Sequence, residues 1–312
     1  MNRICLIYPY FGKFPNYFNL FLESAKHNKN IDFHIYTDNE FLDINADNIY
    51  FHKDSLAEIK NRAAKVLNLN CVLSKPYKLC DYKPLYNLIF EEAKDYEFWG
   101  FGDVDLILGN ISKFVTDDVL NNNVVIGDYG HFMIMKNDSE ITSKFLEYNK
   151  ERINKVFTTD KICGFDEGRK SSYHFIFRDV FKMPIYSVYQ NYADIKVQYN
   201  KLSRHNFKND KTKTNFQGKQ IYTYSNGTLV GHFKNGKQIK SEEILYIHFQ
   251  KRPMKVRTKD ISNYLIIPNS FVEYSDGISK KTFKKFFFVK VADFFHHEFY
   301  WFKALLKWMK KK

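Results

Sequence analysis

Two aspartates with one residue between them, Asp103 and Asp105, follow an apolar run from Tyr96 to Phe101. Where a chain turns at the end of a strand, alternate side chains no longer point to opposite faces, so both carboxylates can converge on one cation. Mg²⁺ and Mn²⁺ prefer oxygen ligands and commonly keep substrate phosphates in their coordination shell. The pattern indicates a site for a metal ion with a nucleoside diphosphate. The alternative is a solvated turn or a helix cap.

The run before these aspartates is one of several short apolar segments that alternate with helical patterns, which predicts a largely parallel α/β sheet. Ligands bind at the carboxyl ends of the strands in such sheets, which is where the two aspartates stand. Asp54 and Ser55 form an N-cap, and Pro84 suits the first position of another helix. The expected strands are 4–8, 33–36, 49–51 and 96–101, and the expected helices are 17–27, 55–69 and 85–94.

Later segments predict further strands and a change of character after residue 200. Residues 124–126 and 131–135 look like strands around a turn, and 139–156 is predominantly helical. Residues 204–219 are polar and lysine-rich, which predicts a surface loop. Two Asn-Gly pairs within 220–239 are strong hairpin signals and predict antiparallel strands. Residues 244–249 are expected to form a buried strand.

Six sequence blocks stand out along the chain: Pro9–Pro15, Tyr36–Asp38, Pro76–Pro84, Trp99–Asp105, Gly130–Asn137 and Ile247–Arg252. In this order they resemble metal-dependent glycosyltransferases of the GT-A type. More narrowly, they are similar to a bacterial family found among capsular and cell-surface polysaccharide synthesis proteins. The resemblance covers most of residues 4–255. The expected fold is therefore α/β, a GT-A-like (Rossmann-like) mixed sheet flanked by helices, with a C-terminal β-hairpin extension and an amphipathic basic helical tail.

The resemblance implies transfer of a hexose from a UDP-sugar, with Mn²⁺ or Mg²⁺, to a growing and probably lipid-linked cell-surface saccharide. The donor would lie across the carboxyl ends of the first strands. Asp103 would contact both the donor and the metal ion, and the metal ion would bridge Asp105 to the diphosphate. A nucleotidyltransferase or phosphotransferase would also use paired aspartates and a metal, although no P-loop is visible. A non-catalytic membrane-bound assembly protein that retains the fold is the remaining alternative.

Several residues fall where such enzymes bind the donor. The resemblance places Asp38, and Asp81 with Lys83, at the base and ribose of the nucleotide, and it adds Tyr10 and Phe11 to the donor site. Asp38 could instead form a turn, and Lys83 could be a surface lysine.

A late cluster, His248 with Lys251 and Arg252, follows the run at 244–249. In GT-A enzymes a late histidine often returns to the metal, and the two cations are suited to neutralise a departing diphosphate. The resemblance therefore makes His248 a metal ligand. The alternative is a hydrogen-bonded histidine of the core.

Transfer also requires a group at the acceptor hydroxyl. Asp166 and Glu167 offer paired carboxylates after a long helix, and a similar acidic pair lies beside the acceptor in many GT-A proteins. An inverting transferase would use such a carboxylate, or a histidine such as His131, as general base, whereas retaining enzymes often lack an obvious one. Helix capping is the alternative role for the acidic pair.

Lysine and arginine exceed aspartate and glutamate by 13, and residues 280–312 carry +8 of this excess. A nucleic-acid-binding protein usually spreads basic residues over a folded face and carries a recognisable motif. Neither feature is visible in this sequence, so we expect no nucleic acid as a partner. The lysines of the tail alternate with bulky aromatic residues at near-helical spacing, which is typical of a segment on an anionic membrane surface. The alternative is a helix packed on the protein's own core.

The four cysteines form no CxxC pair and no zinc-ligand spacing, and the chain starts with a strand rather than a signal peptide. No apolar run approaches the ~20 residues that span a bilayer. We expect a cytoplasmic protein, peripheral on the inner face of the cell membrane. The expected domains are a nucleotide-sugar-binding and acceptor domain over 1–215, a hairpin and strand extension that completes the active site over 216–279, and the membrane-surface tail over 280–312.

Overall fold

The computed structural model describes residues 3–167, 173–196, 201–204, 219–235, 237–251, 253–275 and 277–284. The chain divides into two units. Unit 1 comprises Met1–Phe14, Asn28–Val104 and Ile111–Tyr189, and unit 2 comprises Pro15–His27, Asp105–Asn110 and Gln190–Lys312. The functional domains expected over 1–215, 216–279 and 280–312 remain predictions.

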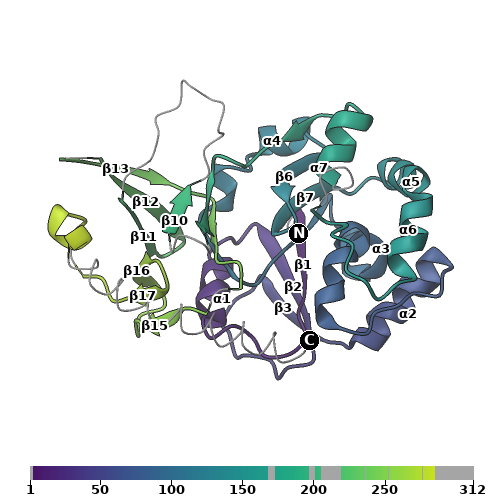
Figure 1. The fold of residues 1–312 in the computed structure, drawn as a ribbon, viewed down its shortest axis with the longest axis horizontal. Helices are drawn as coiled ribbons and strands as arrows, with labels where there is room; N and C mark the ends of the chain where they lie inside the picture. Colours follow the sequence, from purple (N-terminus) through teal and green to yellow (C-terminus); the bar gives the residue numbers. More distant parts are fainter. Residues whose placement is uncertain are drawn as a thin grey trace, which may run out of the picture. The chain divides into compact units, whose positions relative to one another are not determined.

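Unit 1 is built on a mixed sheet of seven strands in the order β3-β2-β1-β4-β7-β6-β8 (Figure 1). The strands are β1 (Ile4–Pro9), β2 (Ile31–Thr37), β3 (Ile49–Lys53), β4 (Phe98–Gly102), β6 (Val125–Tyr129), β7 (Phe132–Lys136) and β8 (Ile185–Tyr186). β1 is parallel to β2 and β4, β2 is parallel to β3, and β7 is antiparallel to both of its neighbours. The predicted α/β class with a mixed sheet is confirmed, and the carboxyl ends of β1 and β4 lie at the same edge.

Helices of unit 1 cover one face of this sheet (Figure 1). Alternate side chains of a strand share a face. Accordingly Cys5, Ile7, Trp99 and Phe101 from β1 and β4 join one apolar core with the helices. The helices are α2 (Leu56–Leu67), α3 (Tyr86–Ile89), α4 (Asp117–Asn122), α5 (Ser139–Tyr148), α6 (Lys150–Phe157) and α7 (Tyr173–Phe175), with shorter 3₁₀ turns at Pro76–Asp81, Lys83–Leu85, Glu91–Asp95 and Ile111–Lys113 and a π-helical turn at Ile176–Val180.

The helix predicted from Ser55 is present, whereas the one predicted over 85–94 is not continuous. Ser55 caps α2, because its hydroxyl accepts a hydrogen bond from the backbone N of Glu58 at 3.2 Å. α3 ends at Ile89, and the backbone of the next residue, Phe90, is extended. The ring of Phe90 packs at 4.3 Å between centroids on Tyr36. Because Phe90 leaves the helical conformation to make this contact, the helix stops there and the chain continues as the 3₁₀ turn Glu91–Asp95.

The long helix predicted over 139–156 is two helices, α5 and α6, that meet at Asn149. The side-chain amide of Asn149 donates to the carbonyl of Phe145 at 2.9 Å, and its backbone N donates to the same oxygen at 3.1 Å. The amide thus competes for a helical acceptor, as asparagine side chains do at helix ends.

Unit 2 contains helix α1 (Phe18–Lys26) and two sheets. The four-stranded sheet has the order β10-β9-β14-β5, and the six-stranded sheet has the order β13-β12-β11-β16-β17-β15. The strands are β5 (Leu106–Leu108), β9 (Tyr192–Lys196), β10 (Lys201–Arg204), β11 (Lys219–Ser225), β12 (Thr228–Asn235), β13 (Gln238–Glu243), β14 (Tyr246–His248), β15 (Lys255–Arg257), β16 (Asn263–Ile267) and β17 (Ser270–Val272).

The predicted hairpin extension is present as β11 and β12. Asn226 and Gly227 form its turn with φ values of 45° and 86°, the left-handed pair that a type I′ turn requires. The strand expected over 244–249 is β14, and it pairs with β5 and β9 rather than with the hairpin.

The start of the tail belongs to the core of unit 2. Phe283, expected on a membrane surface, is 4% exposed and clusters with Ile221, Leu265 and Ile267. The ring of Phe283 is therefore part of the protein's core, whereas Lys280, Lys281 and Lys284 beside it are exposed. Of the loop predicted over 204–219, Arg204 instead ends β10 and Lys219 begins β11. Residues 205–218 and the tail beyond residue 284 lie outside the described residues.

Two further observations concern the cysteines and the helices. All four cysteines are free thiols. Among the described residues, no helix combines the length and the apolar character needed to cross a membrane.

Candidate active site

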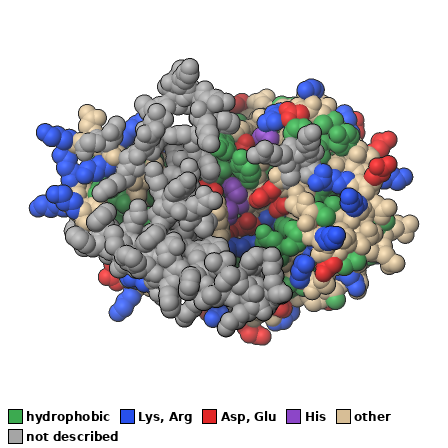
Figure 2. Space-filling model, viewed as in Figure 1, with side chains coloured by type: hydrophobic (Ala, Val, Ile, Leu, Met, Phe, Trp, Pro, Cys, Tyr) green, Lys and Arg blue, Asp and Glu red, His purple; other side chains and the backbone are tan. Residues whose placement is uncertain are grey.

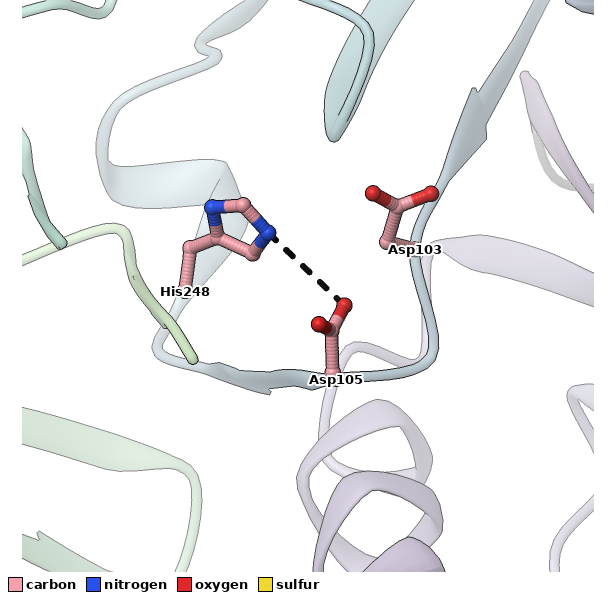
Figure 3. Close-up of side chains that lie close together, drawn as sticks. All are labelled: Asp103, Asp105 and His248. Atoms are coloured by element: carbon pink, nitrogen blue, oxygen red, sulfur yellow. Dashed lines mark ion pairs between the residues drawn. The ribbon is translucent and has the colours of Figure 1, made fainter. Parts of the chain in front are cut away.

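Asp105 and His248 face each other across two paired strands of unit 2. β14 is antiparallel to β5 with His248 opposite Leu106, and the backbone N of Phe249 donates to the carbonyl of Asp105 at 3.0 Å. Nε2 of His248 lies 3.8 Å from Oδ1 of Asp105 (Figure 3). Because Asp105 is only 2% exposed, strand pairing fixes a carboxylate beside an imidazole away from bulk water.

The turn after β14 wraps around the same carboxylate. Gln250 and Lys251 both have left-handed backbones, with φ values of 51° and 56°, which are uncommon for residues with a Cβ. This conformation lets the backbone N of Lys251 donate to Oδ2 of Asp105. The side chain of Lys251 is exposed, and Arg252 lies outside the described residues. The turn thus fixes one oxygen of Asp105 and leaves the other toward His248.

Asp194 is a second acidic residue beside His248, and it belongs to none of the sequence blocks that resemble a known family. β9 is parallel to β14 with Asp194 opposite His248, and Oδ1 of Asp194 lies 3.4 Å from Nδ1 of His248. Its Oδ2 accepts a hydrogen bond from Nε2 of Gln250 at 2.7 Å. The available signal was an acidic residue between the apolar Ala193 and Ile195, but only the sheet order shows which histidine it meets.

In unit 1, Asp103 follows β4 and is bound to a buried lysine. Its backbone N donates to the carbonyl of His131 at 3.1 Å, and Oδ1 accepts from Nζ of Lys83 at 2.7 Å. Lys83 also donates to the carbonyl of Gly130 at 2.8 Å and lies 3.5 Å from Oδ2 of Asp166. Burial alone would lower the pKa of Lys83, but the two carboxylates outweigh it and raise that pKa well above its usual value. Lys83 is therefore a permanent cation between acids, not a surface lysine.

Asp166 is the most perturbed carboxyl of this cluster. It is 5% exposed, and burial raises its pKa to about 7 although the Lys83 ammonium opposes the rise and Glu167 and Asp103 add to it. A Cβ at Gly130 would lie 2.5 Å from Oδ2 of Asp166, so only glycine allows this approach. A carboxyl with a pKa near neutrality can accept a proton at physiological pH. The neighbouring Glu167 is exposed.

His131, expected at the sugar or acceptor, contributes to the site through its backbone. Its carbonyl accepts from Asp103, and its ring is 5% exposed and stacks on Tyr129 with 5.6 Å between centroids. Tyr129 in turn lies 6.1 Å from the ring of Tyr189. The buried ring supports the exposed Tyr129, and a direct contact of His131 with substrate remains a prediction.

Asp81, expected at the nucleotide, instead has a structural position. Its side chain is fully buried and pairs with the equally buried Lys78 at 2.8 Å. Its two oxygens accept from the backbone N of Phe165 at 2.8 Å and of Cys163 at 2.9 Å. Asp81 therefore holds the loop that carries Asp166 and offers no accessible oxygen to a nucleotide.

The residues expected around the nucleotide base differ in exposure. Oδ1 of Asp38 accepts from the backbone N of Gly12 at 3.0 Å, which ties the loop after β1 to the end of β2. Tyr10 is half-buried and donates from its hydroxyl to the carbonyl of Lys13 at 3.3 Å. Phe11, which was predicted to contact the donor, is 7% exposed and packs in the apolar core instead. Asp38 and Tyr10 remain accessible at the carboxyl ends of the strands.

The chain belongs to the protein family DUF6625, which is described as a family of unknown function. The family's sequence model matches residues 6–275. No curated protein matches the chain. Among solved structures, it is similar to the galactosyltransferase LgtC in complex with donor and acceptor sugar analogues, at 10% identity and a TM-score of 0.37, over 79% of this chain and 87% of that one. An active-site mutant of LgtC is similar at 10% identity and a TM-score of 0.36, with the same coverage.

Proposed function

We propose that the protein is a metal-dependent glycosyltransferase that transfers a hexose from a UDP-sugar to a saccharide. The observation that carries the proposal is the buried Asp105 carboxylate facing His248, two residues after Asp103, which itself directly follows β4. Because only Val104 separates Asp103 from Asp105, their Cα atoms lie at most about 7 Å apart. Such an acidic pair at the carboxyl end of a strand suits a cation that carries a diphosphate.

The proposed metal ligands are Asp103, Asp105 and His248, each of which offers one ligand atom (Figure 3). Two carboxylates and an imidazole fit Mn²⁺ better than Mg²⁺, because Mg²⁺ prefers an all-oxygen octahedral shell and imidazole suits transition metals. A bound ion at this position would neutralise charge on the diphosphate that leaves the sugar. The chain's own contribution is to hold one oxygen of Asp105 with the backbone N of Lys251.

Cations of the chain complete the proposed donor site. Lys251, exposed on the turn beside Asp105, and Arg252 would pair with the leaving diphosphate, since charge-assisted bonds to phosphate are strong. Lys83 is committed to Asp103 and Asp166, so its proposed role is to organise these acids rather than to contact ribose. Asp38 and Tyr10 are proposed to contact the base and ribose.

Asp166 is the proposed general base toward the acceptor hydroxyl. Its support is a buried carboxyl whose pKa is raised to about 7, so that the ionised form is available at neutral pH and binds a proton readily. Glu167 is exposed beside it and is proposed to contact acceptor hydroxyls. Transfer would place the acceptor proton on Asp166 as the acceptor oxygen bonds to the sugar and the diphosphate departs.

The proposed acceptor is a saccharide carried on a membrane lipid, with the protein held at the anionic surface by its basic end. Figure 2 shows Lys and Arg side chains gathered at the left end of the view, where Figure 1 draws the end of β13 and the yellow turn of the last described residues. Exposed lysines of this part of unit 2 include Lys237, Lys240, Lys280, Lys281 and Lys284. Each lysine near an anionic surface contributes about 1 kcal/mol to binding. The exposed lysines would attract the protein to anionic lipid electrostatically. We therefore propose that the protein attaches peripherally to the inner face of the membrane.

Calorimetric titration of the full chain with UDP, with and without Mn²⁺, tests the donor site, and hydrolysis of a panel of UDP-hexoses tests catalysis. We expect UDP to bind with Mn²⁺ and much more weakly without it. Asp105→Asn should abolish Mn²⁺-dependent hydrolysis while the protein stays folded, because asparagine keeps an acceptor for Lys251. Asp43→Asn, at an exposed position, is the matched control. Wild-type turnover by Asp105→Asn would refute the metal site, and binding without hydrolysis would indicate a non-catalytic protein.

A further inference from the structure

The imidazole of His248 lies between two carboxylates, Asp194 on β9 and Asp105 directly before β5, and β9 and β5 are the two strands that flank β14. Nε2 is 3.8 Å from Oδ1 of Asp105, and Nδ1 is 3.4 Å from Oδ1 of Asp194. The three side chains are 3%, 11% and 12% exposed for Asp105, His248 and Asp194. The two ring nitrogens therefore have different neighbours, both acidic and both largely removed from water.

Strand register fixes the position of the His248 ring. β14 lies between β5 and β9, and His248 is paired with Leu106 on one side and with Asp194 on the other. A shift of one residue in either pairing would turn the side chain to the opposite face of the sheet. The hydrogen bonds of two strands thus fix where the ring stands.

Asp194 is itself held by the turn that follows β14. Its Oδ2 accepts from Nε2 of Gln250 at 2.7 Å, which leaves Oδ1 toward the ring. The left-handed backbone at Gln250 and Lys251 brings this amide to Asp194 and the Lys251 backbone N to Asp105. One short turn therefore orients both carboxylates that flank His248.

We propose that Asp194 is a positioning residue for His248: its Oδ1, 3.4 Å from Nδ1, keeps the ring proton on Nδ1 and so presents the Nε2 lone pair on the side of Asp105. Metal-binding histidines generally donate their second ring N–H to a carboxylate, which fixes the tautomer and makes the ligand more basic. Asp194 faces the opposite nitrogen from Asp105, so it acts through the ring and is not a fourth ligand. This inference rests on the proposed metal role of His248.

The first test uses the metal-free full chain with ¹⁵N-labelled histidine, at a pH well above the usual histidine pKa. Long-range ¹H–¹⁵N spectra report which ring nitrogen carries the proton, and His248→Gln identifies the signal. We expect the proton on Nδ1 in the wild type and a shift toward the Nε2–H tautomer in Asp194→Ala. A proton on Nε2 in the wild type, or an unchanged tautomer in Asp194→Ala, would overturn the inference.

The second test measures Mn²⁺ affinity by electron paramagnetic resonance, without nucleotide. Asp194→Ala should bind Mn²⁺ about 10- to 100-fold more weakly, and Asp194→Asn, which keeps an acceptor oxygen, should lose less. Asp32→Asn is the matched control, because Asp32 is also buried but accepts from the Tyr96 hydroxyl in unit 1. A purely structural Asp194 would lower the melting temperature and leave the affinity of the folded fraction unchanged. If the wild type bound no Mn²⁺, the proposed metal function would fail, and the tautomer would still decide the role of Asp194.

Discussion

Nζ of Lys83 donates to Oδ1 of Asp103 at 2.7 Å and lies 3.5 Å from Oδ2 of Asp166. One buried cation therefore links a proposed metal ligand to the proposed general base. Its third contact, the carbonyl of Gly130 at 2.8 Å, anchors it to the turn between β6 and β7. Because these groups come from three separated stretches of sequence, the ammonium is what brings them into one cluster.

Lys83→Met should destabilise the fold and perturb Asp166 together. Removing one partner of a buried ion pair leaves charge uncompensated, and we expect the free energy of unfolding to fall by about 3 kcal/mol. The pKa of Asp166 should rise above its present value of about 7, since the lysine is the main group that opposes the rise. Urea unfolding measures the first effect. Lys94→Met, which removes an exposed lysine paired with Glu91, is the control and should change stability little. Equal stability of the two variants would contradict the importance of the cluster.

Asp166→Asn should slow transfer to the acceptor by roughly 10² to 10⁴ and leave UDP affinity unchanged. In the wild type kcat/KM should rise with pH through about 7, because burial places the pKa of the base there and only the ionised form accepts a proton. This limb should be absent in the variant. Glu167→Gln, at the exposed neighbour, should retain the limb. Loss of UDP affinity in Asp166→Asn would place the residue in the donor site instead, and a full rate would remove it from catalysis.

The alternation of short apolar runs with helical patterns was enough to predict the sheet, since β1, β2, β3 and β4 all lie where the sequence placed strands. Capping and turn chemistry were equally local signals. Ser55 caps α2 and Asn226 with Gly227 closes the β11–β12 hairpin, because each acts on its own backbone. Breaks inside helices were not predictable in this way. Phe90 leaves the helix to pack on Tyr36, a contact that no helical pattern reveals.

In the candidate site, too, residues with a local sequence signal could be predicted, whereas residues whose role depends on long-range contacts could not. Asp105 could be found because it stands beside Asp103 at the end of a strand, and His248 because the late block resembles a known pattern. Asp194 could not be found, since its significance depends on the pairing of β9 with β14. Asp81 had the right residue type in a conspicuous block, yet its burial against Lys78 gives it a structural role. Burial is a property of the whole fold and is not encoded by neighbouring residues.

His34 should make the protein less stable as the pH falls. Its Nδ1 lies 3.0 Å from Nε2 of His52 and its Nε2 lies 3.3 Å from the hydroxyl of Tyr96, with Glu92 and Asp32 as the nearby acids. Burial and His52 lower the pKa of His34 to about 4 from an ordinary 6.5, despite the acids. The unfolded chain therefore binds the proton more readily. The stabilising contribution is complete above pH 6.5 and is lost as the pH falls toward 4.

Urea unfolding of wild type and His34→Phe across that pH window measures the effect. Phenylalanine keeps an aromatic ring at the stacking distance of 4.9 Å from Tyr50 but does not titrate. The wild type should lose stability relative to the variant on acidification, by at most about 3 kcal/mol. Parallel pH dependences of the two proteins would show that His34 does not titrate in this window.

Deleting residues 280–312 should damage the fold, whereas deleting 285–312 should not. Phe283 is 4% exposed in the apolar cluster of the six-stranded sheet, and Nζ of Lys234 lies 6.0 Å from its ring centroid. Loss of a buried phenylalanine costs about 3–5 kcal/mol. Thermal unfolding of the two truncated proteins, with Phe283→Ala in the full chain as the matched comparison, measures this difference. Equal melting temperatures for both truncations would place Phe283 outside the stabilising core.

The protein truncated after residue 284 should remain folded and bind UDP, yet lose most of its association with anionic vesicles. Residues 285–312 carry seven lysines against Asp293 and Glu298, a net charge of +5, with most of the tail's aromatic residues. Basic and aromatic residues together favour an anionic interface, and the electrostatic part is screened as salt rises. Co-sedimentation with phosphatidylserine-containing vesicles over a salt series should show binding of the intact chain that weakens with salt. Phosphatidylcholine vesicles are the control. If the truncated protein sediments as strongly as the intact one, the tail does not attach the protein to the membrane, and the exposed lysines of β13 and of residues 280–284 become the remaining basis for attachment.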